Sequence, residues 1–283
     1  MAQSETMQMK HAKPSRRKLG PVQWMILALC LCVLGFSGWK LQGIFAEYKV
    51  GKDTYNEISE FVLTNASVAS IESRIEDDDI WPLYESHVGI SIPEVDFDAL
   101  LNISSYSVAW LYCPDTMINY PVGRANNNKY FLDHTLNGRY NSGGCLFLDY
   151  RNPRDFSDDN NVIYGHHMNN GTMFNSLENY HHQYYYDAHP VIYMTTEEGK
   201  YRLEIFAGYV TPSTSESYLM TFKTREEKQA WLDRCISQSN FTSNIRVTPD
   251  DHIVTLSTCV YDYTNARYVV QCKMVECENG IWY

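Results

Sequence analysis

The sequence has little positive charge after its first residues. Five of its 23 lysines and arginines, but one of its 34 aspartates and glutamates, lie before residue 21. The rest of the chain therefore holds 18 basic and 33 acidic side chains, and no stripe of basic residues with interspersed aromatics interrupts this acidic excess. Such a surface repels phosphate backbones, so we predict that the protein has no nucleic-acid partner.

Several motif classes are also missing. The sequence contains no glycine-rich phosphate-binding motif, no internal repeat and no low-complexity segment, which argues against nucleotide-binding enzymes of the P-loop type and against repeat architectures. What remains is 283 residues with 22 tyrosines. That length suits one domain of about 200 residues with additional segments, and the aromatic content argues against a disordered chain.

One segment, residues 21–39, carries no charge over 19 residues. As a helix it would span about 28 Å, close to the hydrocarbon core of a bilayer. A cleaved signal peptide is the alternative, but the segment is long for one and no small-x-small cleavage site follows. We predict an uncleaved single-pass anchor of type II in the cell membrane, with a cytoplasmic N-terminus, because basic residues precede it: Lys10, Lys13, Arg16, Arg17 and Lys18.

Six of the eight cysteines lie outside the apolar segment and are widely spaced. This spacing differs from that of a small disulfide-rich scaffold. Cys272 and Cys277 are close enough in sequence to pair with each other. Cys113, Cys145 and Cys272 also lie in apolar, strand-like surroundings and could be core residues. The sequence leaves both interpretations open.

From about residue 105 the sequence changes to short runs rich in β-branched and aromatic residues. Because no alternation of strands and helices accompanies these runs, we predict a mainly β fold, a closed barrel or a sandwich. The eight candidate strands are Tyr106–Tyr112, Ile118–Val122, Gly144–Leu148, Val162–Tyr164, Val191–Met194, Tyr201–Thr211, His252–Ser257 and Tyr268–Val275.

Two regions have helical patterns. Thr224, with Glu227 three residues later, forms a capping-box sequence at the start of a helix. The apolar face of this helix would be formed by Trp231, Leu232, Cys235 and Ile236. Between residues 46 and 75, an amphipathic helix or a pair of helices is indicated by the spacing of Tyr55, Ile58, Phe61 and Val62.

The segment Ile253–Cys259 combines a strand pattern with a reactive residue. Four of its residues are β-branched, none is charged, and its last residue is a cysteine. Arg267 follows eight positions later, at the start of the next predicted strand. A guanidinium facing a thiol favours the thiolate and can stabilise a developing oxyanion. A cysteine at a strand end is also common as a small buried apolar residue.

A catalytic cysteine needs a base, and His166 has the most suggestive context. It follows a short predicted strand and Gly165, and an Asn-Asn-Gly turn comes after it. The adjacent pairs at 166/167 and 181/182 also suggest a membrane-anchored haem- or metal-binding surface module. On a strand, however, each pair can easily supply only one ligand. A papain-like hydrolase is disfavoured because His166 precedes Cys259, the reverse of the papain order.

Three segments together resemble the signature blocks of sortases, the membrane-anchored cysteine transpeptidases of Gram-positive bacteria. These segments are Tyr164–Met168, Thr255–Cys259 and Asn265–Arg267. Two further segments, Ile118–Val122 and Phe147–Asn152, resemble class B sortases in particular, as does the predicted helix at 224–238. The resemblance covers roughly residues 85–283.

The resemblance implies an eight-stranded sortase β-barrel preceded by N-terminal helices. Together with the charge and apolar patterns above, it predicts a cytoplasmic tail (1–20), a transmembrane anchor (21–39), an N-terminal helical or linker region (40–84) and a catalytic domain (85–283).

It also implies roles for individual residues. Cys259 would be the nucleophile, His166 the acid and base, and Arg267 the group that binds the oxyanion or the substrate carbonyl. His166 is preferred to His167 because the family's catalytic histidine directly follows Tyr-Gly. Substrate-binding positions correspond to Ser257, Tyr218 and Leu219, although the latter two could be packing residues.

The function expected from this resemblance is transpeptidation without a metal or cofactor. The enzyme would cleave a C-terminal sorting signal after threonine, form a thioacyl enzyme and transfer the surface protein to an amine. That amine belongs either to the lipid-linked cell-wall precursor or to a pilin lysine, and the sequence leaves this choice open.

Overall fold

A computed structural model of the chain describes residues 20–64 and 92–277. It consists of two compact units that divide after Ala46. The predicted cytoplasmic tail, apart from Gly20, lies outside the described residues, and so does much of the predicted 40–84 region.

Helix α1 (Pro21–Val62) is 42 residues long and includes the predicted anchor segment. Its most apolar part has a mean hydropathy of 1.8 and is not buried against the protein. By length and composition this helix is able to cross a membrane. Of the first unit, the structure describes residues 20–46, which are Gly20 and the N-terminal part of α1.

The C-terminal part of α1 belongs to the second unit and packs against it. Tyr55, Ile58 and Val62 are buried, as their helical spacing predicts. Phe61, which was expected on the same face, is instead 67% exposed. The Tyr55 hydroxyl donates a 2.5 Å hydrogen bond to the carbonyl of Gly144. The predicted helix is therefore present, as a continuation of the apolar helix rather than a separate element.

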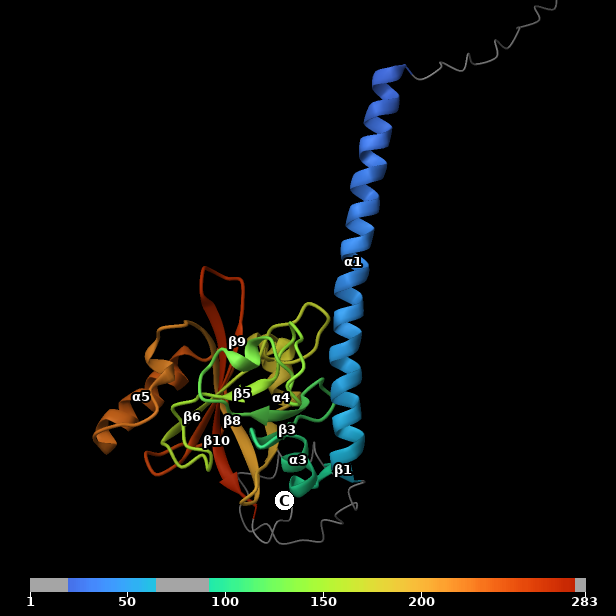
Figure 1. Cartoon of the computed structure of the whole chain (residues 1–283). Helices are drawn as coiled ribbons and strands as arrows, with labels where there is room; N and C mark the ends of the chain where they lie inside the picture. The colour runs from blue at the N-terminus through green and yellow to red at the C-terminus, as the bar shows by residue number, and fades with distance from the viewer. Residues whose placement is uncertain (1–19, 65–91, 278–283) are drawn as a thin grey trace, which may run out of the picture. The chain divides into compact units, whose positions relative to one another are not determined.

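The second unit is built on a closed β-barrel (Figure 1). Its eight strands follow the order β10-β8-β7-β3-β4-β5-β6-β9. All eight predicted strands are present, so the prediction of a mainly β barrel is confirmed. Their bounds are β3 (Ser107–Tyr112), β4 (Asn119–Gly123), β5 (Leu146–Leu148), β6 (Asn160–Tyr164), β7 (Val191–Thr195), β8 (Lys200–Pro212), β9 (Ile253–Cys259) and β10 (Ala266–Glu276). A separate two-stranded sheet pairs β1 (Leu63–Thr64) with β2 (Glu94–Val95).

Short helices connect the strands. The α-helices are α3 (Phe97–Ile103), α4 (Gln183–Ala188) and α5 (Arg225–Gln238), and the 3₁₀ helices are η1 (Tyr130–Leu132), η2 (Asn175–His181) and η3 (Glu216–Tyr218). The sequence pattern did not reveal α3 and α4. With seven and six residues, they are too short to display a helical period.

Helix α5 covers part of the barrel's outer surface and confirms the capping prediction. Thr224 Oγ1 accepts a hydrogen bond from Glu227 N (3.2 Å), and Glu227 Oε2 accepts one from Lys223 N (3.0 Å). Trp231 and two other predicted apolar positions pack in a cluster with residues of β8, β9 and β10. The fourth, Ile236, is 46% exposed, so the buried face of α5 is narrower than predicted.

The two faces of strand β9 have different surroundings. Val254 and Leu256 point into the main hydrophobic core, whereas Thr255 and Ser257 alternate with them and therefore point outward. All four are buried, because the connection between β8 and β9, which includes α5, covers the outer face. The outer face of β9 is thus a buried polar surface that ends at Cys259.

The buried cysteines belong to the packing of the barrel. Cys113, Cys145 and Cys272 are free and buried, so the local pair of Cys272 with Cys277 does not form. Burial raises the pKa of the Cys113 and Cys145 thiols to about 12. These thiols therefore stay protonated at neutral pH and are poor nucleophiles.

Candidate active site

His166 and Cys259 lie at the same end of two adjacent parallel strands. In the pairing of β6 with β9, Tyr164 stands opposite Ser257, and Gly165 N donates to the carbonyl of Ser257 (3.1 Å). His166 and Cys259 each follow two residues after this pair. Since neighbouring strands are about 4.8 Å apart, this register brings the two residues to one edge of the barrel.

Arg267 joins them from the other side of β9. In the antiparallel pairing of β9 with β10, Arg267 is the direct partner of Cys259. Side chains of directly opposite residues project from the same face of a sheet. The three predicted residues therefore lie at the same end of β6, β9 and β10, and Cys259 is half-buried there.

The glycine before His166 allows this strand end to pack closely. A Cβ atom at Gly165 would lie 2.5 Å from Leu146 Cδ2 and 2.6 Å from Phe174 Cδ2, both parts of the buried core. Any larger residue would push the turn outward and displace His166. The glycine in the Tyr-Gly-His segment is thus required by packing.

The imidazole of His166 is oriented by a backbone carbonyl. Its Nε2 atom lies 2.8 Å from the Leu132 carbonyl oxygen at the end of η1. Because a carbonyl only accepts hydrogen bonds, Nε2 carries the hydrogen, and Nδ1 is left to exchange a proton. Asp262, an acidic residue three positions after Cys259, is exposed in the turn after β9. The sequence offered no sign of the role of Leu132, since any residue supplies a carbonyl.

The side chain of the neighbouring histidine, His167, contacts η2 instead. His167 Nε2 pairs with Glu178 Oε2 on η2 at 2.7 Å, and Asn175 Nδ2 also contacts its ring (3.2 Å). The side chain is 11% exposed. The two consecutive histidines therefore have separate environments, with His167 tied to η2 and His166 directed to Leu132.

Arg267 begins β10 immediately after a tight turn. Asn265 adopts a φ of 64°, a left-handed conformation that asparagine tolerates well. The Arg267 guanidinium donates through Nη1 to the carbonyl of Ala266 (2.9 Å). Within residues 20–64 and 92–277 no carboxylate forms an ion pair with it, so most of its donors remain for a ligand.

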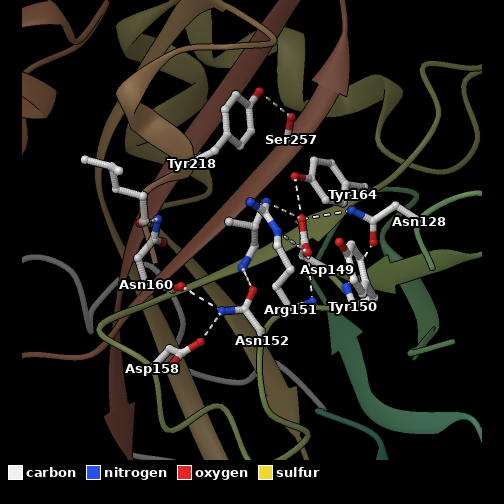
Figure 2. Close-up of polar contacts among 12 residues, drawn as sticks. Asn128, Asp149, Tyr150, Arg151, Asn152, Asp158, Asn160, Tyr164, Tyr218 and Ser257 are labelled. Atoms are coloured by element: carbon white, nitrogen blue, oxygen red, sulfur yellow. Dashed lines mark hydrogen bonds and ion pairs between the residues drawn. The ribbon is translucent and has the colours of Figure 1, made fainter. Parts of the chain in front are cut away.

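The three predicted substrate-binding residues lie together but differ in accessibility. Ser257 is 1% exposed, and its Oγ is 3.0 Å from the Tyr218 hydroxyl (Figure 2). The Tyr218 ring stacks on Tyr164, with 6.1 Å between centroids and an angle of 25°. Leu219 is 42% exposed. Ser257 therefore supports Tyr218, while Leu219 presents an apolar surface.

Tyr218 lies close to the reactive residues. Burial raises its pKa to about 12, an effect partly opposed by the hydrogen bond to Ser257 and by the charge of Arg267. A thiolate at Cys259 raises the pKa further. At neutral pH Tyr218 is therefore an uncharged hydroxyl that can donate or accept a hydrogen bond near the thiol.

A cavity of about 250 Å³ lies between the C-terminal part of α1 and the loop after His166. Tyr55, Asn141 and Met168 are among its lining residues, whereas Cys259, His166 and Arg267 are not.

The described part of the chain contains no group of three histidine, cysteine or acidic side chains arranged to hold a metal ion.

Comparison with known proteins identifies the family. A model of the sortase domain matches residues 111–275. Sortase B of Listeria monocytogenes is 32% identical over 254 residues, which cover 88% of this chain and 96% of that protein. Sortase B of Staphylococcus aureus is 34% identical over 183 residues, covering 64% and 75%.

A solved structure gives the same result. The Staphylococcus aureus sortase B–substrate complex superimposes with a TM-score of 0.67 and 28% identity, covering 82% of this chain and all of that one. The likeness therefore extends through the barrel that carries Cys259, His166 and Arg267. This chain belongs to the sortase family, as a class B member, and is a cysteine transpeptidase.

Proposed function

We propose that this sortase cleaves a sorting signal after threonine and transfers the surface protein to an amine, using Cys259, His166 and Arg267. The observation that carries the proposal is the position of these residues at one end of three adjacent strands. His166 and Cys259 each lie two residues beyond the Tyr164–Ser257 pair of β6 and β9. Arg267 on β10 pairs directly with Cys259 on β9. Acyl transfer requires a nucleophile, a group that carries a proton and a positive charge near the developing oxyanion, and these three residues supply them.

In the first half-reaction the thiol of Cys259 passes its proton to Nδ1 of His166, and the resulting thiolate attacks the threonine carbonyl carbon. The carbonyl oxygen becomes negatively charged, and the Arg267 guanidinium, which remains protonated at all physiological pH values, stabilises it. When the tetrahedral intermediate collapses, the peptide C–N bond breaks, and His166 gives its Nδ1 proton to the departing amine. The thioester between Cys259 and the threonine remains on the enzyme.

In the second half-reaction an amine attacks the thioester. His166 takes the proton from the attacking nitrogen, and the C–S bond breaks to regenerate the Cys259 thiolate. The product contains a new amide bond between the threonine and the acceptor. The acceptor is an amine of the lipid-linked cell-wall precursor or a pilin lysine, and the residues at the site are compatible with either.

The proposed location follows from the charge around α1. We place the basic N-terminal tail in the cytoplasm and the catalytic unit, residues 85–283, outside the cell, with 21–39 as the membrane anchor. The apolar part of α1 supports this proposal by its length and hydropathy. In this arrangement the enzyme meets secreted surface proteins as they leave the membrane.

Mass spectrometry of the full chain in detergent, incubated with a library of threonine-containing peptides, tests the mechanism. Without an amine we expect an acyl adduct on the tryptic peptide that contains Cys259, labile to hydroxylamine as a thioester is. With an amine present we expect the adduct to be replaced by a ligated peptide. An adduct on another residue, or cleavage without any adduct, would contradict the proposal.

Replacing Arg267 by lysine tests the oxyanion role. Lysine keeps the charge but loses the forked donors, so we expect kcat to fall about 10²-fold, with a smaller change in KM. Arg225→Lys provides the matched control, because Arg225 forms an exposed ion pair with Asp250 outside the site. Equal activity of both variants in steady-state peptide ligation would argue against this role.

A further inference from the structure

The segment from Ser217 to Met220, which carries Tyr218 and Leu219, has few internal interactions to hold it in place. It includes the end of the three-residue helix η3 and the start of the irregular connection to α5. Leu219 is 42% exposed. A segment of this kind needs external contacts to keep one conformation.

Three hydrogen bonds to the main chain of this segment come from a single residue of β6. The side-chain amide of Asn160 donates to the carbonyl of Leu219 (2.8 Å) and to that of Ser217 (3.2 Å). Its backbone N–H donates to the carbonyl of Met220 (3.0 Å). Asn160 is fully buried, so its side chain is shielded from solvent.

Asn160 is itself fixed from the opposite side. Its Oδ1 accepts a hydrogen bond from the Thr255 hydroxyl of β9 (2.6 Å), and its carbonyl accepts one from Asn152 Nδ2 (3.0 Å). Thr255 and Cys259 belong to the same strand, four residues apart. The amide of Asn160 therefore connects the strand that carries the thiol to the segment that carries Tyr218 and Leu219.

A second support acts on the Tyr218 ring. Tyr164, on which this ring stacks, donates its hydroxyl to Asp149 Oδ2 (3.0 Å) (Figure 2). Asp149 is fully buried and also accepts from Arg151 Nη2 (2.8 Å) and Asn128 Nδ2 (2.9 Å). Burial alone would raise the pKa of Asp149, but the hydrogen bonds from Arg151 hold it below its usual value. Asp149 thus remains an acceptor that holds Tyr164 in place.

We propose that Asn160 is a positioning residue that holds the Ser217–Met220 segment as one wall of the groove for the sorting signal. Asn160 does not touch the thiol or the reacting carbonyl. It acts through Tyr218 and Leu219, whose distance from Cys259 it determines. This inference rests on the proposed function, because it assumes that a peptide lies beside Cys259.

Replacing Asn160 by alanine removes both side-chain hydrogen bonds to the segment. We expect KM for the donor peptide to rise about tenfold, as for the loss of two such bonds, while kcat, the KM for the amine acceptor and the rate of Cys259 alkylation by iodoacetamide stay near the wild-type values. Hydrogen exchange should accelerate at residues 217–220 and not along β9. All measurements use the full chain in detergent.

Asn161→Ala is the matched control. Asn161 is the next residue, is equally buried, and its amide also donates to main-chain carbonyls, those of Phe156 (2.9 Å) and Asp158 (3.1 Å). These carbonyls lie in another loop. A general loss of stability would affect both variants, whereas the rise in donor KM is expected for Asn160→Ala alone.

Two outcomes overturn the inference: an unchanged donor KM in Asn160→Ala, or an equal rise of the donor KM in Asn161→Ala. If Asn160→Ala does not fold, Asn160→Ser keeps a partner for Thr255 but cannot reach both carbonyls, and the same rise in KM is expected. A wild-type enzyme that forms no acyl adduct on Cys259 would instead refute the proposed function, which separates the two failures.

Discussion

Replacement of Cys259 by alanine is expected to lower kcat/KM for peptide ligation by about 10⁴-fold or more, because no other group at the site can form the acyl intermediate. The other cysteines of the barrel core cannot substitute for it. Cys113 and Cys145 are buried, and burial raises the pKa of both thiols to about 12. The measurement is release of the C-terminal fragment of a sorting-signal peptide, followed by chromatography.

The folded state should be almost unaffected by this change, because Cys259 is half-buried at a strand end and loses only its sulfur. Cys235→Ala is the control for loss of a thiol as such, since Cys235 lies on α5 and accepts a hydrogen bond from the Tyr209 hydroxyl (3.2 Å). It should keep the activity. Continued fragment release by Cys259→Ala would show that another residue is the nucleophile.

Replacement of His166 by alanine is expected to lower kcat/KM by about 10³-fold, since proton transfer to the leaving amine then depends on water. The structure offers a matched control in the adjacent residue. His167→Ala removes an imidazole that pairs with Glu178 on η2, and we expect its activity to stay within about threefold of the wild type. Steady-state ligation rates of the His166→Ala and His167→Ala variants show which of the two histidines is needed for the reaction.

A second measurement distinguishes a chemical role of His166 from a structural one. The variant should lose the pH dependence that a general acid imposes on kcat/KM, while its thermal unfolding stays close to that of the wild type. The assignment of roles would be reversed if His167→Ala lost activity and His166→Ala did not. It would also fail if both variants were equally impaired and equally destabilised.

Most of the barrel was predictable from the sequence because its strands are short, apolar and bounded by turns. Each of the eight predicted strands has a counterpart within a few residues. The exposure of Phe61 and Ile236 was not predictable. Periodicity identifies the apolar side of a helix, but the width of the buried face depends on what packs against it.

The residues that orient His166 and Tyr218 were also not predictable from sequence patterns. The carbonyl of Leu132, 2.8 Å from His166 Nε2, belongs to the main chain and leaves no signature. Asn160 resembles any polar residue at the start of a strand, and its partners lie 57 and 59 residues later. Ser257, a predicted substrate-binding residue, is buried with its Oγ 3.0 Å from the Tyr218 hydroxyl, a contact that no sequence pattern indicates.

The family, the strands, the apolar helix and the three candidate catalytic residues were predictable because motif order, residue type and periodicity are local properties of the chain. Which groups lie side by side depends instead on how the strands pair and pack. The register of β6, β9 and β10 aligns His166, Cys259 and Arg267, and hydrogen bonds across the barrel orient His166 and Tyr218. Such register and cross-strand contacts arise only when distant segments pack, since they depend on the pairing of whole strands.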